Sequence, residues 1–526
     1  MKRVLGIVLA LAMIFSLAAC GSTPAEDTKE KNRDVVIGTD MTNLTTLDVW
    51  DSDYNCVFEV SDAIFDRLFD KNIETLELET NLLAEWPTIS EDGLVYTFKL
   101  KEDVKWSDGK PLTAKDVEFT LNYFYGADTA SGNTWVSEAI LGCDEMMAGE
   151  SDYLEGFKLI DDYNFQITLK EPYSAFLATL ATSMMPILPA HARPDAGDAW
   201  GTTVMPIGSG PYKVESFEAG VNLVLVPNEN YRGTKPDLDH LIIKNMDNAT
   251  AMMEYEAGNI DYFTLATDQV EDAKARLSDN FHQRMVVSGV RIGLNMSMKP
   301  LDDVRVRKAF ALAVDLDAII NGYYKGNVAP LNGVIPYGIP GNDNSLEQTP
   351  YDIEEAKKLL ADAGYPDGIT LDVAIKENQD DFAFIFQLIQ EQAAAAGITL
   401  NITKMDSSAY SETRQNGQIM VTMTQIAADF IDSHQYVYNQ FNSVVSDRRS
   451  ICLHDDWFDQ RSTEARYVTG DENAAIAKEL DYYLCKELYA TIPICQDINA
   501  YVCSDRVSNL FLKGDNLINF AGVSVK

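Results

Sequence analysis

Within the stretch 90–123, apolar residues recur at every second position over residues 94–100. A period of two predicts a half-buried strand, whose inward side chains are Leu94, Tyr96, Phe98 and Leu100. A helix is then predicted to begin after Thr113, because a threonine hydroxyl at this position accepts hydrogen bonds from the amides of the first turn. Asp116 adds negative charge near the positive end of the helix dipole.

Apolar residues recur with the period of a strand or a helix elsewhere in the chain. Residues 34–40 are predicted to form an opening strand, and residues 221–227 alternate in the same way. Helical spacing predicts a helix over residues 57–69. A further helix is predicted to bury one face that consists of Val306, Phe310, Ala313 and Val314.

A βαβ unit is predicted in the second half of the chain. Asp352 begins a helix with a capping pattern, and Gly364 ends that helix. An apolar strand at 369–375, a helix over 380–396 and a second strand at 398–402 follow. This order implies two parallel strands joined by a right-handed crossover.

The amino terminus has the pattern of a secretory signal. Lys2 and Arg3 precede an uncharged run over residues 4–17, which is too short for a comfortable membrane span. The sequence LAAC, ending at Cys20, resembles a bacterial lipobox, in which the cysteine is diacylated and becomes the first residue. An ordinary signal with a chance cysteine is the alternative. Residues 21–33 are small and polar, as in a flexible tether.

Composition limits the classes of function. A chain of 526 residues with 46% hydrophobic residues is expected to form two or three domains with large cores. The net charge of −39 argues against nucleic-acid binding and against direct adhesion to anionic lipid. A solvated acidic surface explains this charge. No cofactor is expected.

Cysteine and histidine patterns do not indicate an enzyme. No C-x-x-C pair exists, so a zinc site of the usual spacing is not expected, while disulfides and free thiols both remain open for Cys56, Cys143, Cys452, Cys485, Cys495 and Cys503. No H-E-x-x-H or G-x-S-x-G motif occurs. The sequence around Gly208 lacks the Lys-Ser/Thr of a phosphate-binding loop. His454 with the two aspartates after it permits a metal cluster, although a polar turn is the simpler interpretation.

Several stretches resemble the family 5 extracytoplasmic solute-binding proteins that feed peptide ABC importers. Residues 90–123 match the family pattern S-x-D-G-x-x-Y-x-F-x-L followed by D-G-x-P-L-T-A-x-D-V at nearly every position. Further matches are SMMPILPAH (183–191), GSGPYKV (208–214), MMEYEAGNID (252–261) and the strand and helix of residues 291–320. The resemblance extends over about residues 34–520.

The resemblance implies an α/β fold, a periplasmic-binding-protein-like clamshell of two lobes with an additional domain, three domains in all. The expected segments are a signal peptide (1–19), a lipidated tether (20–33), domain I in lobe 1 (34–75, 205–290 and 492–526), domain II extending lobe 1 (76–204) and domain III as lobe 2 (291–491). Chain crossings between the lobes would act as the hinge, so that closure captures the ligand. Gly208 and Gly210 are expected to supply backbone freedom for such a crossing.

The resemblance also implies where the ligand binds. In peptide binders of the family, a carboxylate after W-x-x holds the α-amino group of the ligand, and the preceding strand pairs with the peptide backbone. Asp429 has this carboxylate position, and an ammonium buried between lobes needs such a partner. The candidate ligand-binding residues are therefore Arg414, Gln425, Ile426, Ala427 and Asp429. Asp429 could instead cap the next helix, a role that fits Asp432 better.

Three departures from the family pattern put the ligand class in question. Ile426 replaces a tryptophan, Met420 an aspartate and Ser433 a proline. Arg414 could hold a ligand carboxylate with its planar fork or be a solvated helix cation. Alternative ligands within the family are nickel, a metal chelate or an oligosaccharide, and a secreted hydrolase is the alternative outside it.

The expected function is that of an extracytoplasmic lipoprotein. It would be a monomer, anchored on the outer face of the cell membrane through Cys20. It would bind a peptide ligand between its lobes and deliver it to the membrane permease subunits of an ABC importer. No catalytic residue and no metal site are expected.

Overall fold

The computed structural model of the protein describes residues 32–51, 55–129, 131, 133–134 and 138–526. The predicted signal peptide, the lipidation site at Cys20 and most of the tether lie outside the described residues. Among the described residues, no helix has the length and apolarity needed to cross a membrane.

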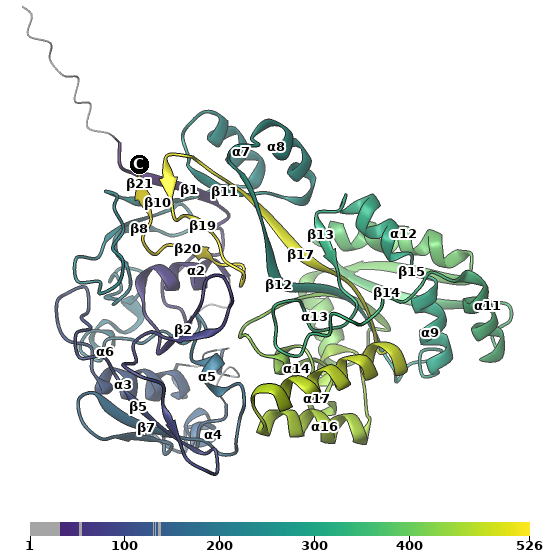
Figure 1. Ribbon diagram of the computed structural model, residues 1–526, viewed down its shortest axis with the longest axis horizontal. Coiled ribbons are helices and arrows are strands. Elements are labelled where there is room, and N and C mark those ends of the chain that lie inside the picture. The colour runs from purple at the N-terminus through teal and green to yellow at the C-terminus, as the bar shows by residue number, and fades with distance from the viewer. Residues whose placement is uncertain (1–31, 52–54, 130, 132, 135–137) are drawn as a thin grey trace, which may run out of the picture.

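Two lobes lie side by side and share one large sheet (Figure 1). We call residues 32–280 and 504–526 lobe 1, and residues 295–490 lobe 2. Two long strands, β12 (Phe281–Leu294) and β17 (Thr491–Cys503), connect the lobes and pair with each other in antiparallel register. This mixed α/β architecture is the two-lobed clamshell that the family resemblance implied.

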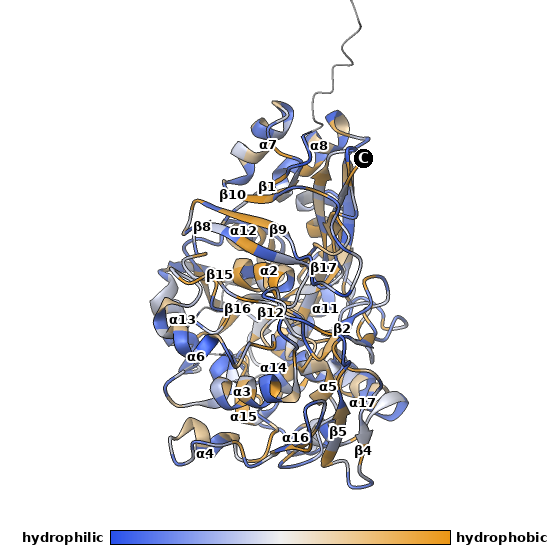
Figure 2. Cartoon of the chain, turned by 90° about the vertical axis from the view of Figure 1, so that its left-hand side faces the viewer, coloured by the Kyte–Doolittle hydropathy of each residue, from blue (hydrophilic) through white to orange (hydrophobic). Residues whose placement is uncertain are grey.

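The sheet has eleven strands, and its strand order is β15-β14-β16-β12-β17-β11-β1-β10-β9-β8, with β13 paired to β17. Figure 2 shows many hydrophobic residues in the strands of this sheet. In lobe 1, the predicted opening strand is confirmed as β1 (Val35–Thr39), and the alternating segment is confirmed as β9 (Asn222–Pro227). The neighbouring strands in lobe 1 are β8 (Tyr212–Glu218), β10 (Leu241–Asn245) and β11 (Tyr262–Thr264).

The strand predicted from the alternation at 94–100 is confirmed as β5 (Val95–Lys99). It belongs to a smaller sheet of lobe 1, with β4 (Thr88–Ile89), β6 (Phe157–Leu159) and β7 (Asn164–Thr168). The rings of Phe98 and Phe165 stack across two of these strands, with centroids 4.9 Å apart. Alternation therefore placed the apolar side chains on the correct face.

The helix predicted after Thr113 is confirmed as α3 (Ala114–Tyr125), and Thr113 and Asp116 form a capping box at its start. The Thr113 hydroxyl also donates to Asp116 over 3.3 Å. The Asp116 carboxylate also accepts from the Thr113 amide (2.8 Å). A carboxylate is a stronger acceptor than a hydroxyl, so Asp116 reaches back to cap the helix.

The helix predicted over 57–69 is shorter than expected. It is α2 (Asn55–Ile64), and Phe69 already begins β2 (Phe69–Lys71). The Ile64 carbonyl accepts from the Gly210 amide (2.8 Å), so a segment distant in sequence binds the group that would continue the helix. Apolar spacing alone cannot reveal such a partner.

Gly208 and Gly210 do not provide a crossing between lobes, because both precede β8 within lobe 1. Neither has a positive φ. Their role is close approach: a Cβ at Gly208 would lie 1.9 Å from the Ile64 carbonyl oxygen. The prediction of backbone freedom is therefore wrong, and the absence of a side chain is the reason for glycine here.

Lobe 2 contains the predicted βαβ unit. Strands β14 (Ile369–Lys376) and β15 (Ile398–Met405) are parallel and joined by α12 (Asp380–Ala394). The predicted cap at Asp352 is confirmed, because its Oδ1 accepts from the Glu355 amide (3.0 Å) at the start of α11 (Ile353–Asp362). The four residues of the predicted buried face around Phe310 are all buried, and they lie on or just after α9 (Val304–Leu312).

The remaining elements complete the two lobes. Lobe 1 also has β3 (Leu78–Thr80), α4 (Cys143–Met147), α5 (Phe176–Thr179), α6 (Arg193–Ala196), α7 (Asn248–Glu256), α8 (Val270–Arg276), β18 (Val507–Ser508), β19 (Phe511–Leu512), β20 (Ile518–Asn519) and β21 (Ser524–Val525). Lobe 2 also has α10 (Leu316–Ala318), β13 (Val328–Pro330), α13 (Ser407–Gln415), β16 (Val421–Ala427), α14 (Tyr438–Phe441), α15 (Ser443–Ser446), α16 (Asp456–Tyr467) and α17 (Gly470–Tyr482).

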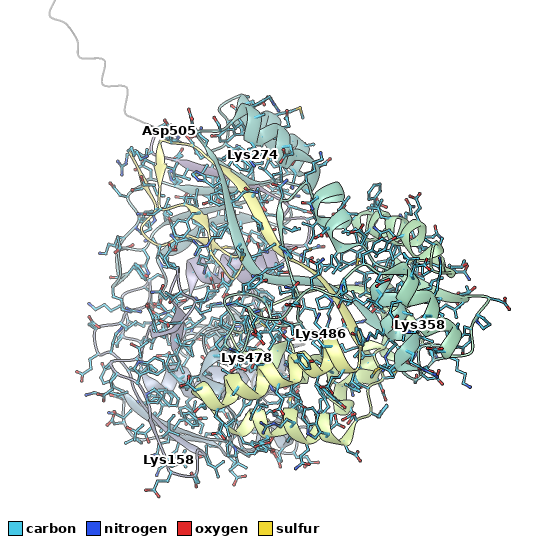
Figure 3. The ribbon with its side chains drawn as sticks, turned by 45° about the vertical axis from the view of Figure 1, so that its right-hand side comes forward. Lys158, Lys274, Lys358, Lys478, Lys486 and Asp505 are labelled. Carbon is cyan, nitrogen blue, oxygen red and sulfur yellow. The ribbon has the colours of Figure 1, made fainter. Side chains whose placement is uncertain are left out.

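The six cysteines after Cys20 are all free thiols, and five of them are buried. This settles the choice that the sequence left open: these side chains act as small apolar groups of the cores. Figure 3 shows helix α17 along one side of lobe 2, with Lys478 on it and Lys486 after its end.

Candidate functional site

Strand β16 has a free edge beside the predicted site. Along its whole length it pairs with β12, from Val421 opposite Leu294 to Ala427 opposite Ser288. On its other side, within the described part of the chain, β14 pairs with β16 only at Val421. The rest of β16 therefore presents backbone N–H and C=O groups that an extended chain could pair with.

The predicted residues of β16 lie along this free edge. Gln425 and Ala427 are exposed and Ile426 is half-buried. The Gln425 side chain donates from Nε2 to Oδ2 of Asp497 on β17 (2.6 Å). Alternate exposure along an edge strand would leave room for a ligand side chain at every second position.

Asp429 lies two residues beyond the end of β16 and is half-buried. Its Oδ2 accepts a hydrogen bond from Nε2 of Gln435 (2.6 Å). Burial raises the pKa of Asp429 to about 6, although the hydrogen bond from Gln435 and the charges of Arg449 and Lys71 act in the opposite direction. A carboxylate kept away from water in this way gains from a cationic partner.

The alternative role for Asp429, as a helix cap, is wrong. Asp432 caps the next turn, η5 (Ser433–Gln435), by accepting from the His434 amide (2.8 Å). This role of Asp432 is the one predicted. Asp429 therefore has a raised pKa, and capping of η5 does not explain why a carboxylate lies in this position.

The site lies where the two lobes meet. Phe430, next to Asp429, is 1% exposed and packs in the hydrophobic cluster of lobe 1 rather than in a cluster of lobe 2. Lys71 on β2 contributes its charge from lobe 1, held by an ion pair of 2.6 Å with Asp515. A ligand beside Asp429 would therefore be enclosed by both lobes.

A second contact between the lobes involves the loop before α5 and the end of α16. The Ser174 amide donates to the Arg466 carbonyl (2.7 Å), and the Tyr467 hydroxyl donates to Glu171 (3.0 Å). The rings of Tyr173 and His434 meet edge to face, with centroids 5.4 Å apart. Burial lowers the pKa of His434 to about 3, so this imidazole is neutral within the contact.

Arg414, near the end of α13, is not the solvated cation that one interpretation expected. It is half-buried, and its Nε is enclosed without a hydrogen-bond partner among the described residues. Burial lowers its pKa. The Arg414 carbonyl accepts from the Ser450 hydroxyl (2.9 Å), which joins α13 to the turn η6 (Asp447–Arg449).

Two further arginines, which the sequence did not single out, lie near Arg414. Arg291 on β12 is 5% exposed; its Nη2 donates to Gln440 (3.1 Å), and its guanidinium lies 4.4 Å from the centre of the Phe441 ring. Burial, followed by the charges of Arg414 and Arg449, lowers the pKa of Arg291 to about 9. We call Arg291, Arg414 and Arg449 the arginine cluster. No local sequence signal could have found it, because three separate elements bring its members together.

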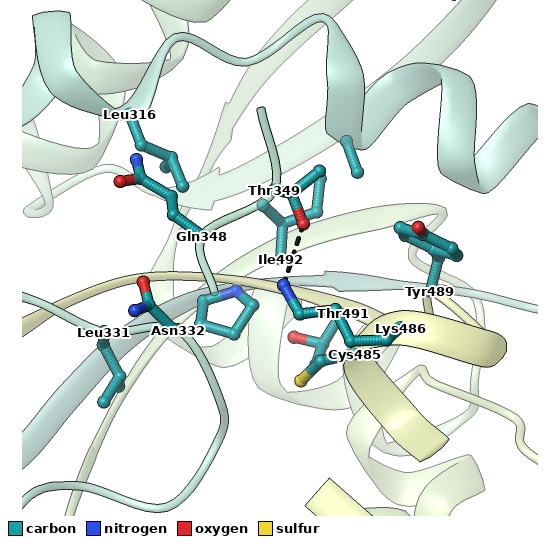
Figure 4. Close-up of a pocket in the computed structure, with 12 residues that line it drawn as sticks. Leu316, Leu331, Asn332, Gln348, Thr349, Cys485, Lys486, Tyr489, Thr491 and Ile492 are labelled. Atoms are coloured by element: carbon teal, nitrogen blue, oxygen red, sulfur yellow. Dashed lines mark hydrogen bonds between the residues drawn. The ribbon is translucent and has the colours of Figure 1, made fainter. Parts of the chain in front are cut away.

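Two other concave regions contain none of the predicted residues. One is a small pocket of lobe 2 lined by Leu316, Gln348 and Thr349, among others, where Lys486 Nζ donates to the Thr349 hydroxyl over 3.2 Å (Figure 4). The other is a groove of about 510 Å³ between α15 and α16. Neither therefore forms part of the candidate site.

The possible metal cluster at His454 is a polar turn. His454 Nε2 lies 3.0 Å from Asp447, while Asp455 caps α16 by accepting from the Phe458 amide (2.8 Å). Among the described residues, no group of three or more His, Cys, Asp or Glu side chains is arranged to hold a metal ion.

Comparison with known proteins identifies the fold and the family. A model of the bacterial extracellular solute-binding proteins, family 5, matches residues 77–447. The dipeptide-binding protein of Escherichia coli K12 is 28% identical over 407 residues, which cover 74% of each chain. A glutathione-binding protein of Salmonella paratyphi A is 29% identical over 409 residues, covering 76% of this chain and 73% of the relative.

Solved structures share the fold. HbpA2 from Haemophilus parasuis superposes with a TM-score of 0.80 at 23% identity, over 94% of this chain and 100% of that one. The binding protein DppA from Helicobacter pylori, in complex with the peptide STSA, gives a TM-score of 0.75 at 21% identity, over 94% and 98%.

The raised pKa of Asp429 predicts how its replacement changes stability. Above pH 6 the carboxylate is ionised in a site that disfavours charge, so Asp429→Asn should increase the free energy of unfolding at pH 8 by about 1–2 kcal/mol. The gain should disappear at pH 4, near the pKa of an unfolded aspartate, where the buried side chain is already neutral. Urea unfolding of ligand-free protein at both pH values measures this.

Asp352→Asn removes one charge from an exposed cap and is the control, with an expected change below about 0.5 kcal/mol, because Asn caps as well as Asp. A loss of stability in Asp429→Asn at pH 8 would contradict the assignment of a strained carboxylate.

Proposed function

Because the chain belongs to family 5 of the bacterial extracellular solute-binding proteins, we propose that it captures peptides between its lobes and delivers them to an ABC importer. Its family and fold are those of substrate-binding proteins rather than enzymes. The observation that carries the proposal is the free edge of β16, which ends two residues before a half-buried carboxylate at the junction of the lobes.

The free edge of β16 would hold the peptide through its main chain. An extended ligand that pairs with Gln425, Ile426 and Ala427 gains backbone hydrogen bonds that do not depend on its sequence. Its side chains would point alternately to either side of the strand. The smaller Ile426, where the family pattern has a tryptophan, would leave more room at one of these positions.

Asp429 would hold the α-amino group of the peptide. Its carboxylate has one hydrogen bond, from Gln435, and its pKa is raised because burial is only partly compensated. An ammonium group would supply the missing charge and form a charge-assisted hydrogen bond. Arg414 would contribute positive charge for the carboxylate of the ligand.

Movement of the lobes would admit and enclose the peptide. The division into domain I (34–75, 205–290 and 492–526), domain II (76–204) and domain III (291–491) places both crossings within β12 and β17. The register of these strands shifts between Met285 and Gly289, which makes this the natural bending point. The permease subunits of the importer would recognise the closed form of the monomer.

The Asp429 proposal predicts a specific loss of affinity. Asp429→Asn should weaken binding of Ala-Ala-Ala at least about thirtyfold, because removing one partner of a buried charge pair costs about 2–5 kcal/mol. N-acetyl-Ala-Ala-Ala, which has no ammonium, should bind the wild type poorly and the mutant no worse. Calorimetry on both proteins and both peptides measures the coupling free energy.

Asp432→Asn is the matched control, because Asn caps η5 as well as Asp. A coupling free energy near zero between Asp429 and the amino group would refute this role of Asp429 and favour a ligand that is not a peptide.

A lipid anchor at Cys20 would hold the protein on the outer face of the cell membrane. Cys20→Ala should release the protein from the membrane fraction without changing its unfolding temperature, because Cys20 lies before the residues that the structure describes. Fractionation of cells, with labelling by a radioactive fatty acid, tests this. A mutant that stays labelled and membrane-bound would show that anchoring does not depend on this cysteine.

A further inference from the structure

The arginine cluster forms no ion pair with a carboxylate among the described residues, although the charge of Asp481 acts on Arg291 and that of Asp429 acts on Arg449. Arg291 is 5% exposed, and its Nε and that of Arg414 are enclosed without a partner. This arrangement stands out in a chain that has 81 acidic and only 42 basic residues, where carboxylates are abundant.

Such a cluster is costly without an anion. A buried guanidinium requires a partner, and charges of the same sign raise the cost further. Arginine cannot escape this cost by losing its proton, because even the lowered pKa of Arg291, about 9, leaves it charged at neutral pH. Gln440 and the Phe441 ring supply only neutral partners for it.

The cluster lies around β16. Arg291 is on β12, opposite Thr424 and across β16 from its free edge, and Arg414 is on the helix that precedes β16 in sequence. The charge of Arg449 acts on Asp429. A peptide with its amino group at Asp429 would therefore lie near the cluster.

The charges of this site exceed what a neutral peptide can balance. Arg291, Arg414, Arg449 and the neighbouring Arg448 carry four positive charges, and Asp429 and Asp481 carry two negative ones, which leaves two positive charges. A peptide with an amino group and one terminal carboxylate adds none, so the excess remains. Only a ligand with a further anionic group reduces it.

We propose that the arginine cluster binds an acidic side chain of the ligand, so that the site selects peptides with a carboxylate in addition to the terminal one. This inference rests on the proposed peptide-binding function and names the class of peptide. Planar guanidinium groups bind carboxylates in a bidentate manner, which suits three arginines that converge from separate elements.

Matched tripeptides test the selectivity by calorimetry on the purified full chain. Glu-Ala-Ala, Ala-Glu-Ala and Ala-Ala-Glu are each compared with the peptide that has Gln in the same position. At one position at least, the wild type should bind the Glu peptide at least about tenfold more tightly than the Gln peptide. Ala-Ala-Ala amide, compared with free Ala-Ala-Ala, measures separately what the terminal carboxylate contributes.

Variants connect this selectivity to the cluster. Arg449→Gln and Arg414→Gln should bring the Glu-to-Gln ratio of affinities close to one, while Arg448→Gln, which removes the same charge from an exposed neighbour, should leave the ratio unchanged. Arg291→Lys keeps the charge of the buried member and should reduce the ratio only in part, because lysine lacks the planar fork. The ligand-free Arg449→Gln and Arg414→Gln proteins should unfold at a temperature no lower than that of the wild type, because repulsion is relieved.

The outcomes separate the two proposals. Binding of Ala-Ala-Ala without any preference for Glu over Gln would overturn the acidic side-chain site and leave peptide binding intact. The same holds if amidation abolishes binding while the acidic side chain adds nothing, since the cluster would then serve the terminal carboxylate alone. A Glu preference that persists in Arg449→Gln, Arg414→Gln and Arg291→Lys would also overturn it. If no peptide binds to the wild type, the proposed function itself fails.

Discussion

The pairing of β12 with β17 is the interaction on which the rest of the structure depends. These two strands carry the only backbone ladder, among the described residues, that continues from one lobe into the other. Within lobe 2, β12 also pairs with β16 and so sets the position of the free edge. Asp429 follows β16 in sequence, and Arg291 lies on β12 itself. One ladder therefore positions the proposed hinge, the proposed ligand strand and one arginine of the cluster.

Several charges at the site have no ion-pair partner among the described residues. Some buried charges elsewhere are paired, as Lys71 is with Asp515 and Arg193 with Asp48, whereas the buried Arg307 donates to backbone carbonyls. At the junction of the lobes, Asp429 accepts a hydrogen bond from the neutral Gln435, and the arginine cluster forms no ion pair in the part of the chain that the structure describes. Strain of this kind is typical of functional sites, where a bound ligand relieves it.

Local patterns predicted where strands and helices form. Contacts between distant segments decided where one of these helices ends and which charged residues come together. Alternation identified β5 because a half-buried strand must alternate, and Asp352 identified the start of α11 because a cap acts on the next turn. The end of α2 was misplaced because the amide of Gly210, distant in sequence, binds the Ile64 carbonyl. Spacing in a family motif suggested Asp429 as a candidate, and its role stays a prediction. Arg291 and Arg449 could not be singled out in this way, because only the tertiary fold brings them to Arg414.

The central claim is that the lobes enclose a peptide. The most direct test is to purify the protein from cells, unfold it in guanidinium chloride, and identify the released small molecules by mass spectrometry. The account predicts short peptides with free amino groups, in amounts comparable to the protein. Release of a metal chelate or an oligosaccharide in that amount, with no peptide, would contradict it.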